Sequence, residues 1–260
     1  MRIISYNVNG IRAAIGKGFL DWLKTDPADV ICLQETKALR ENVDAKLFNA
    51  IGYHDFWFSA QKKGYSGVAI LTRFKPDNIV FGTGHHISDF EGRVLQIDIG
   101  NLRVINAYFP SGTSGSERQS YKYQWLDEFL LYVWELKKKH PNMVICGDYN
   151  IAHKTVDIHD PKGNKNSSGF LPDERAWMDR FFENGFYDTF RLVHPEALHR
   201  YSWWSQRFPS VRLNNKGWRI DYISVSEALK NRVADAEILP EVKHSDHCPV
   251  YLKLTDQAIS

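Results

Sequence analysis

Asp148 and Asn150 follow a run of four apolar residues, 143–146, which predicts a β-strand buried on both faces. Gly147 would let the backbone turn sharply after this strand, and ligands of open α/β sheets bind just beyond the carboxyl ends of strands. A carboxylate at such a position can bind a metal ion or accept a proton, while a nearby amide donates a hydrogen bond. A plain Asp/Asn turn would have the same sequence, so both interpretations stay open until other residues are considered.

Polar residues follow other predicted strands as well. They are Asn7, Asn9, Glu35, Tyr108, Asp221, Asp246 and His247. A single polar residue after a strand would not indicate a site. Because polar residues follow several predicted strands, we expect them to form one site at a single edge of the fold. Glu35 offers the hard oxygen ligands that magnesium prefers, since this ion takes one or two carboxylates and several waters. No Cys/His pairing has the spacing of a zinc site.

His247 directly follows Asp246 in the sequence. Adjacent side chains on an extended backbone point to opposite sides, so we do not expect Asp246 to orient His247. Asp221, from another predicted strand, is the better candidate partner. A histidine held by a carboxylate can act as a general base or stabilise a developing negative charge. The alternative is a turn residue that precedes the last strand.

Short apolar runs predict the strands that must position these residues. The predicted strands cover residues 2–7, 29–33, 66–72, 93–99, 102–109, 143–146, 219–225, 234–239 and 250–254. Predicted helices cover residues 18–24, 41–50 and 172–182, the apolar positions between 125 and 136, and a short segment before residue 234. Strands that alternate with helices, together with a hairpin at Gly100-Asn101, predict an α/β fold with one mixed sheet or two packed sheets.

The composition sets few limits on function. The 260 residues are 43% hydrophobic and fit one domain, 1–260, while a net charge of +2 neither demands nor excludes a nucleic-acid partner. Cys32, Cys146 and Cys248 stand in apolar strand contexts, as expected of buried thiols in a reducing compartment. No run approaches the roughly 18 apolar residues of a membrane span. We therefore expect a soluble cytoplasmic protein that makes no contact with membranes.

Five motifs together resemble one known family. They are SYNVNGIR at residues 5–12, LQETK at 33–37, GDYN at 147–150, GWRIDY at 217–222 and SDHCP at 245–249. In this order and spacing they resemble the exonuclease III family of apurinic/apyrimidinic (AP) endonucleases, part of the endonuclease/exonuclease/phosphatase superfamily. The resemblance runs from Arg2 to about Leu254. Each motif alone would be weak, whereas five in register are specific.

The resemblance implies a four-layered α/β sandwich, in which two packed mixed β-sheets are flanked by helices. It implies a nuclease of base excision repair that hydrolyses the phosphodiester 5′ to an abasic site with Mg²⁺ or Mn²⁺. It further implies 3′-phosphodiesterase and 3′→5′ exonuclease activities. The implied partner is double-stranded DNA with abasic sites or blocked 3′ ends, bound by a monomeric enzyme.

The resemblance also assigns roles to single residues. The implied metal ligands and their near neighbours are Asn7, Glu35, Asp148, Asn150, Asp246 and His247, with Asn9 close to the metal and phosphate. Asp148 would prepare or deprotonate the attacking water, and Asn150 would hold this water or a phosphoryl oxygen. His247, paired with Asp221, would contact the phosphate, and Tyr108 would bond the phosphate or the leaving oxygen. The choice of base between Asp148 and His247 stays open.

Superfamily members that act on other phosphoesters share these catalytic motifs, so the substrate must be inferred from other segments. Loop 151–170 resembles the loop with which the repair enzymes grip DNA beside the lesion. The implied DNA contacts are Arg12, Lys17, Lys37, Tyr65, Arg118, Lys122, Asn164, Lys165 and Ser167. Trp203, Trp218 and Ile220 match an apolar pocket for a flipped-out abasic sugar, whereas Trp204 is assigned to the core.

Three departures from the family pattern leave the balance of its activities open. Asn9 replaces an Asp of some relatives, Ser114 stands where some insert an Arg between bases, and Ser167 replaces an Asn. Two other functions are considered. One is a phosphoesterase for inositol phosphates or lipid head groups, and the other is a non-catalytic DNA-binding protein.

Overall fold

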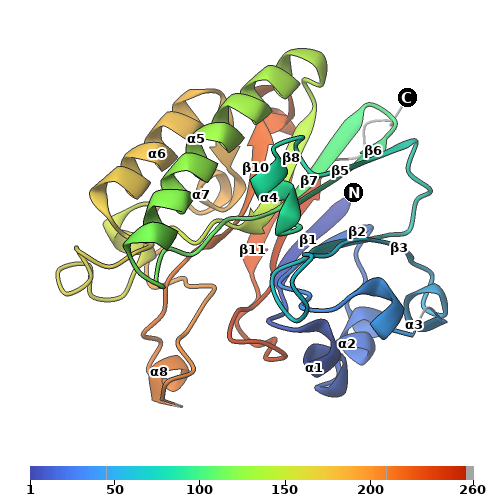
Figure 1. The fold of residues 1–260 in the computed structure, drawn as a ribbon, viewed down its shortest axis with the longest axis horizontal. Coiled ribbons are helices and arrows are strands. Elements are labelled where there is room, and N and C mark those ends of the chain that lie inside the picture. The colour runs from blue at the N-terminus through green and yellow to red at the C-terminus, as the bar shows by residue number, and fades with distance from the viewer. Residues whose placement is uncertain (45, 209, 256–260) are drawn as a thin grey trace.

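Two six-stranded β-sheets pack face to face, and helices cover the outer face of each sheet (Figure 1). The computed structural model describes residues 1–44, 46–208 and 210–255. Figure 1 shows α5 and α6 side by side over one sheet and α1 to α3 against the other. The four layers confirm the α/β sandwich that the sequence resemblance implies.

The first sheet contains the amino-terminal strand at its centre. Its order is β11 (Val233–Ile238), β12 (Val250–Leu254), β1 (Arg2–Asn7), β2 (Val30–Gln34), β4 (Val68–Thr72) and β3 (His54–Phe58). Only β1 and β2 are parallel neighbours, with Asn7 opposite Gln34 at their shared end. The polar residues that follow β1 and β2 therefore emerge at the same edge of the sheet.

The second sheet repeats this arrangement. Its order is β5 (Asn78–Phe81), β6 (Val94–Ile99), β7 (Leu102–Tyr108), β8 (Met143–Asp148), β10 (Asp221–Ser226) and β9 (Phe186–Asp188). The parallel pair here is β7 and β8, with Tyr108 opposite Asp148. Antiparallel β10 begins at this same end, where Asp221 pairs with Asp148.

Helices and short 3-10 turns connect the strands. The helices are α1 (Ile11–Gly16), α2 (Phe19–Thr25), α3 (Lys46–Asn49), α4 (His86–Phe90), α5 (Ser116–Lys139), α6 (Pro172–Glu183), α7 (Thr189–Val193) and α8 (Ser210–Leu213). The 3-10 turns cover Arg40–Asn42, Thr155–Asp157 and Glu227–Arg232. None of the helices within the described ranges is long and apolar enough to cross a membrane.

The alternation of side chains along β8 explains its continuous apolar sequence. Val144 and Cys146 face the core between the two sheets. Met143 and Ile145 face the opposite layer, where Trp125 of α5 packs. Both faces of this strand are thus buried, as four consecutive apolar residues predict.

Most predicted elements lie within two residues of their expected positions. The predicted helix 41–50 is wrong, because a 3-10 turn and the short α3 occupy this segment; residue 45 of that prediction lies outside the described residues. Strands β3, β5 and β9 and the short helices α1, α4, α7 and α8 were not predicted. They have three to six residues, too few for a clear period.

The predicted turn at Gly147 is also wrong. Gly147 lies inside β8, and a Cβ atom there would come within 2.0 Å of the carbonyl oxygen of Ala107 on β7. The glycine is therefore required for close packing of two parallel strands. The left-handed backbone belongs instead to Asn150, whose φ is 52°.

Candidate active site

Both sheets direct the ends of their central strands into one cleft. Nδ2 of Asn7, at the end of β1, donates at 2.9 Å to Oδ2 of Asp148, at the end of β8 in the other sheet. The same Nδ2 of Asn7 donates to Oε1 of Glu35 at 2.9 Å. Asn7 therefore connects the carboxylates of Glu35 and Asp148, which follow or end strands of different sheets.

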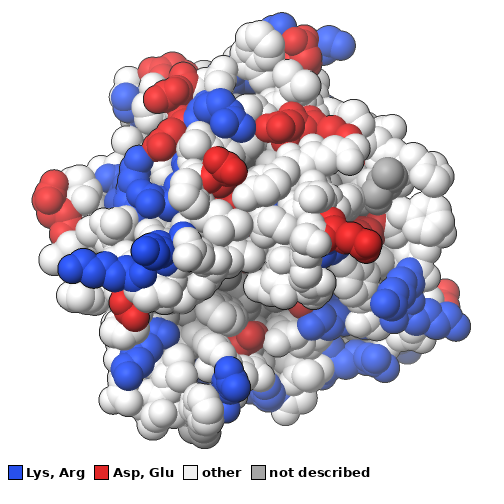
Figure 2. Space-filling view, turned by 60° about the vertical axis from the view of Figure 1, so that its left-hand side comes forward, with Lys and Arg blue, Asp and Glu red and all other residues white. Residues whose placement is uncertain are grey.

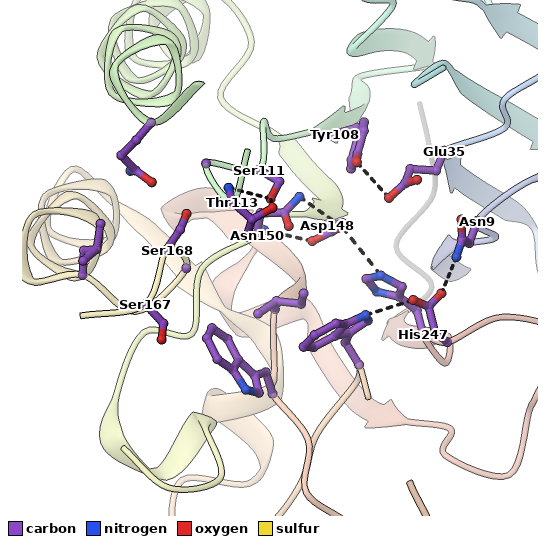
Figure 3. Close-up of a pocket in the computed structure, with 18 of the residues that line it drawn as sticks. Asn9, Glu35, Tyr108, Ser111, Thr113, Asp148, Asn150, Ser167, Ser168 and His247 are labelled. Carbon is purple, nitrogen blue, oxygen red and sulfur yellow. Dashed lines mark hydrogen bonds and ion pairs between the residues drawn. The ribbon is translucent and has the colours of Figure 1, made fainter. Parts of the chain in front are cut away.

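Glu35 lies just after β2 and is held by three donors. The Tyr108 hydroxyl donates to Oε1 of Glu35 at 2.8 Å, as Figure 3 shows, and Nζ of Lys37 lies 2.7 Å from Oε2. Burial alone would raise the pKa of Glu35, but the ammonium of Lys37 and the amide of Asn7 outweigh it and lower that pKa. The Glu35 carboxylate is therefore ionised at neutral pH and could serve as an oxygen ligand.

Asp148 and Asn150 form an Asx turn, as one of the two interpretations of this stretch predicts. The backbone N–H of Asn150 donates to Oδ1 of Asp148 at 2.8 Å, and its side-chain Nδ2 donates to the Phe109 carbonyl at 2.9 Å. Asp148 is 1% exposed. Burial, together with the carboxylates of Asp221 and Glu35, raises the pKa of Asp148 despite the opposing charge of His247.

Asp221 orients His247, as predicted from the sequence. Nδ1 of His247 lies 2.9 Å from Oδ2 of Asp221, and Nε2 points toward Asp148, whose Oδ2 is 3.9 Å away (Figure 3). Burial opposes a charge on the ring, but the carboxylates of Asp221 and Asp148 outweigh it and raise the pKa of His247. The geometry favours a protonated imidazole that presents an N–H donor to the cleft.

Asp246 has hydrogen-bond partners of its own, separate from the pair of Asp221 and His247. Its Oδ1 accepts a hydrogen bond of 2.9 Å from Nδ2 of Asn9, and its Oδ2 accepts one of 3.1 Å from the indole of Trp203. These donors and His247 lower the pKa of Asp246, although burial opposes them. Asn9 and Asp246 thus lie at the rim of the same cleft.

The donor set fits a divalent cation. One ligand atom each from Glu35, Asp148 and His247 lie within 4.8 Å of one another, in the only such cluster among the described residues. Because the pKa of His247 is raised, its ring suits a hydrogen-bond donor better than a ligand, which must be neutral. Two carboxylates with room for water are the arrangement that magnesium prefers.

A cavity of about 810 Å³ opens beside these residues. Trp203, Trp218 and Ile220 form one wall, and the two indoles meet edge to face with centroids 6.0 Å apart. Loop residues Ser167 and Ser168 also line this cavity (Figure 3). The three predicted pocket residues therefore lie together in the cavity that Glu35, Asp148 and His247 also line, while Trp204 is 3% exposed and belongs to the core.

The predicted DNA contacts occupy varied environments. Arg12, Lys17 and Lys165 are exposed, Asn164 bonds within its own loop, and Lys37 pairs with Glu35. Arg118 donates to the Tyr65 hydroxyl at 2.7 Å and pairs with Glu91. Figure 2 shows Lys and Arg in separate groups among Asp and Glu, with no continuous basic patch on this face.

The prediction that Lys122 faces a DNA phosphate is wrong. Its side chain is completely buried, and its Nζ lies 2.6 Å from Oε1 of Glu174. The ion pair with α6 stabilises it in the interior instead, and no local sequence pattern reveals a partner so distant along the chain.

Two residues that support the site were not predicted. The Ser202 hydroxyl donates to Oδ2 of Asp221 at 2.6 Å. The guanidinium of Arg212 donates to the carbonyl oxygens of Ser245, Pro240 and Val242, each at 2.9 Å, and so fixes the segment that precedes His247. Their contacts are nonlocal, and Ser202 in particular stands in an aromatic run without any distinguishing motif.

Together, the fold and the cleft define a phosphoester hydrolase. Carboxylates that can hold a cation lie beside a carboxylate-bound histidine and several amide donors, which can stabilise the charge of a phosphoryl transition state.

Comparison with known proteins identifies the family. The model of the Endonuclease/Exonuclease/phosphatase family matches residues 4–253. The exodeoxyribonuclease of Bacillus subtilis (strain 168) is 46% identical over 253 residues, which cover 97% of this chain and 98% of that protein. The DNA repair nuclease APEX1 of Danio rerio is 38% identical over 256 residues, which cover 98% of this chain and 82% of that protein. An AP endonuclease structure from Archaeoglobus fulgidus matches with a TM-score of 0.91 and 31% identity, covering 98% and 100% of the two chains. The chain belongs to the Endonuclease/Exonuclease/phosphatase family, and its resemblance to the AP endonucleases is confirmed.

Proposed function

We propose that this protein is a metal-dependent DNA repair nuclease that cleaves the phosphodiester 5′ to an abasic site. The observation that carries this proposal is the position of Asp148. It accepts hydrogen bonds from the side chains of Asn7 and Asn150 at the floor of a cleft whose wall is formed by Trp203 and Trp218. Nuclease relatives at 46% and 38% identity support the same reaction class.

In the proposed reaction, Asp148 accepts the proton of the attacking water. Its Oδ1 is fixed by the backbone N–H of Asn150, and Asn7 holds its Oδ2, so the carboxylate has one orientation. The raised pKa of this carboxyl makes it a better base than an exposed aspartate. Because His247 is favoured in its protonated form, we assign it to the phosphate and assign the base to Asp148.

The other donors stabilise the phosphate charge. His247 presents Nε2–H, with Asp221 behind it, and the amide of Asn150 lies beside Asp148. The Tyr108 hydroxyl, whose pKa is raised by burial and by Glu35, remains a neutral donor. Preorganised donors of this kind stabilise a transition state because they need no reorientation as charge develops.

We propose Mg²⁺ as the physiological cation, with Mn²⁺ as a substitute, held by Glu35 and Asp148. When bound, it supplies positive charge that neutralises the phosphate and stabilises the developing charge on its oxygens. Oxygen ligands and the lack of a cysteine in the cluster of described residues support a hard cation.

The pocket walls support an abasic site as the preferred lesion. Trp203, Trp218 and Ile220 offer apolar and aromatic surface to a sugar that lacks a base. Extrusion of a nucleotide from the duplex is least costly where no base must be unpaired or unstacked. The predicted contacts at Arg12, Lys17, Tyr65, Arg118 and the 164–167 loop would position the backbone. A monomeric state and a cytoplasmic location stay predictions.

The decisive experiment is cleavage of a duplex with one tetrahydrofuran abasic analogue. We expect the purified protein to nick this duplex 5′ to the lesion with Mg²⁺, to lose activity in EDTA and to regain it with Mn²⁺. Asp148→Asn serves as the inactive control. Intact abasic duplex after incubation with the wild-type protein and either cation would exclude the proposal.

The same samples test the two alternative functions. Blunt-duplex and 3′-phosphoglycolate substrates measure the exonuclease and phosphodiesterase activities, and an inositol phosphate or phosphocholine lipid tests the other phosphoesterase classes. Tight binding of abasic duplex without cleavage, unchanged by Asp148→Asn, would instead indicate a non-catalytic DNA-binding protein. The intact cluster of Glu35, Asp148 and His247 opposes this last alternative.

A further inference from the structure

Lys122 of α5 and Glu174 of α6 form an ion pair from which solvent is excluded. Both side chains are 0% exposed, and Nζ of Lys122 lies 2.6 Å from Oε1 of Glu174. A buried ion pair adds little stability over apolar residues of similar size, because desolvation offsets the attraction. Stability alone therefore does not account for this ion pair.

The ammonium of Lys122 also contacts the backbone of the catalytic turn. Nζ donates to the carbonyl oxygen of Asn150 at 2.8 Å. Asn150 has a left-handed backbone with φ of 52°, a conformation that an asparagine adopts only at some cost in free energy. A charged donor on its carbonyl opposes rotation of this peptide group toward a more relaxed conformation.

Glu174 connects the same pair to the wall of the cleft. Its Oε2 accepts hydrogen bonds from the backbone N–H groups of Gly169 at 2.6 Å and Leu171 at 3.0 Å. The carbonyl oxygen of Gly169 in turn accepts a hydrogen bond of 2.8 Å from the N–H of Ala152. The chain that follows Asn150 is thus tied to the loop segment that lines the cavity beside it.

The side chain of Asn150 has little freedom once its backbone is fixed. Its Nδ2 donates to the Phe109 carbonyl at 2.9 Å and approaches Oδ2 of Asp148 at 3.3 Å. Both contacts depend on where the backbone of Asn150 lies relative to β7 and β8. A shift of about 1 Å at a catalytic group can reduce a rate by about 100-fold.

We propose that Lys122 is a positioning residue of the nuclease, whose ammonium group, held by Glu174, fixes the Asn150 backbone and thereby the Asn150 side chain beside Asp148. This inference rests on the proposed function. It replaces the expected contact of Lys122 with a DNA phosphate by an indirect role on the chemical step.

The test compares Lys122→Met, Glu174→Gln and the double variant Lys122→Met/Glu174→Gln. Lys122→Met removes the donor to Asn150 and leaves a buried carboxylate unpaired, so both kcat and Tm should fall. The double variant removes that unpaired charge, while the glutamine side chain retains an oxygen acceptor for the loop amides. Glu174→Gln keeps the donor to Asn150.

The measured quantities are kcat and KM for the abasic duplex, the fraction folded and the Tm. We expect the double variant to recover Tm while kcat stays about 10- to 100-fold below wild type and KM changes less than about threefold. Glu174→Gln should lose stability with a much smaller fall in kcat per folded molecule. If Lys122→Met does not fold, the double variant and Glu174→Gln still provide the comparison.

Arg103→Met is the matched control. Arg103 is a buried cation of β7 that pairs with Asp98 at 2.6 Å. It lies near the first residue of β7, whereas Tyr108 is the last residue of this strand. The Arg103→Met variant should have a lower Tm than wild type but an unchanged kcat per folded molecule. A double variant whose kcat returns to wild type together with its Tm would overturn the positioning role. Failure of the wild-type protein to nick the duplex would instead refute the proposed function.

Discussion

His247 is oriented by Asp221, which lies 26 positions away in the sequence, and not by the adjacent Asp246. The Nδ1 atom of His247 lies 2.9 Å from Oδ2 of Asp221, whereas the carboxylate of Asp246 accepts hydrogen bonds from Asn9 and Trp203. Alternation of side chains on an extended backbone explains this division. Asp221 therefore orients the histidine, whereas Asp246 connects Asn9 and Trp203 at the rim of the cleft.

Asp221→Asn should lower kcat for abasic-duplex cleavage by about 100- to 10,000-fold, because an amide neither fixes the required imidazole tautomer nor stabilises its charge. Steady-state kinetics and the far-UV circular dichroism spectrum check activity and folding together. Asp127→Asn, at an exposed position of α5, is the control and should leave kcat near wild type. Near-normal turnover of Asp221→Asn would remove the pair from the mechanism.

The stability of the protein should depend on the ionisation of Glu91. Burial opposes ionisation, but the guanidinium groups of Arg118 and Arg93 lower the pKa of Glu91 from 4.5 to about 2. A lowered folded-state pKa means that the stabilisation is fully present above the unfolded pKa of 4.5 and is lost as the pH falls toward 2. Discounted for partial exposure, the contribution is about 1 kcal/mol.

Urea unfolding at a series of pH values from about 2.5 to about 7 measures this dependence in wild type and Glu91→Gln. The variant should be less stable at neutral pH and lose less stability than wild type as the solution is acidified. Asp127→Asn, which removes an exposed carboxylate paired with Arg180, is the control and should follow the wild-type curve. Parallel curves for wild type and Glu91→Gln would contradict the prediction.

Gly147→Ala should destabilise the protein by about 3 kcal/mol or more, the upper part of the range for overpacked interiors. The added Cβ would come within 2.0 Å of the Ala107 carbonyl oxygen, and only separation of β7 from β8 could relieve this contact. Gly16→Ala is a matched control, because no atom lies within 4 Å of a Cβ atom there and Gly16 ends α1. Chemical denaturation should show Gly16→Ala unchanged or slightly more stable; equal effects at both glycines would contradict this explanation.

Gly147 also illustrates how far sequence reasoning reaches. Apolar runs placed β1 and β12 correctly and ended β8 two residues too early, and strand ends predicted that Asn7, Glu35, Asp148 and His247 meet. The local sequence does not distinguish a glycine that a neighbouring strand requires from a glycine in a turn, however. At Gly147 the carbonyl group that excludes a side chain belongs to Ala107, which is far away in the sequence. Lys122 was misplaced for the same reason: its partner Glu174 lies on another helix. Local patterns thus predict strands and their ends, whereas nonlocal packing decides the environment of single residues.

Trp218→Ala should reduce the preference for abasic DNA more than it reduces phosphodiester hydrolysis itself. Trp218 contributes its ring to the cavity wall beside Trp203 and Ile220, but none of its side-chain atoms bonds the catalytic carboxylates in the described structure. Trp203 is less suitable for this test because its indole also holds Asp246.

The ratio of kcat/KM for the abasic duplex to that for exonucleolytic removal of a paired 3′ nucleotide isolates this preference. We expect Trp218→Ala to lower the ratio by about tenfold, since loss of one stacking contact costs on the order of 1–3 kcal/mol. Trp134→Ala, at a 42% exposed position of α5, should leave the ratio unchanged. Equal losses in both activities would show that Trp218 supports the fold of the cleft and does not select the lesion. A residue that selects the lesion should change kcat/KM mainly for the abasic duplex, because only that substrate would contact its ring.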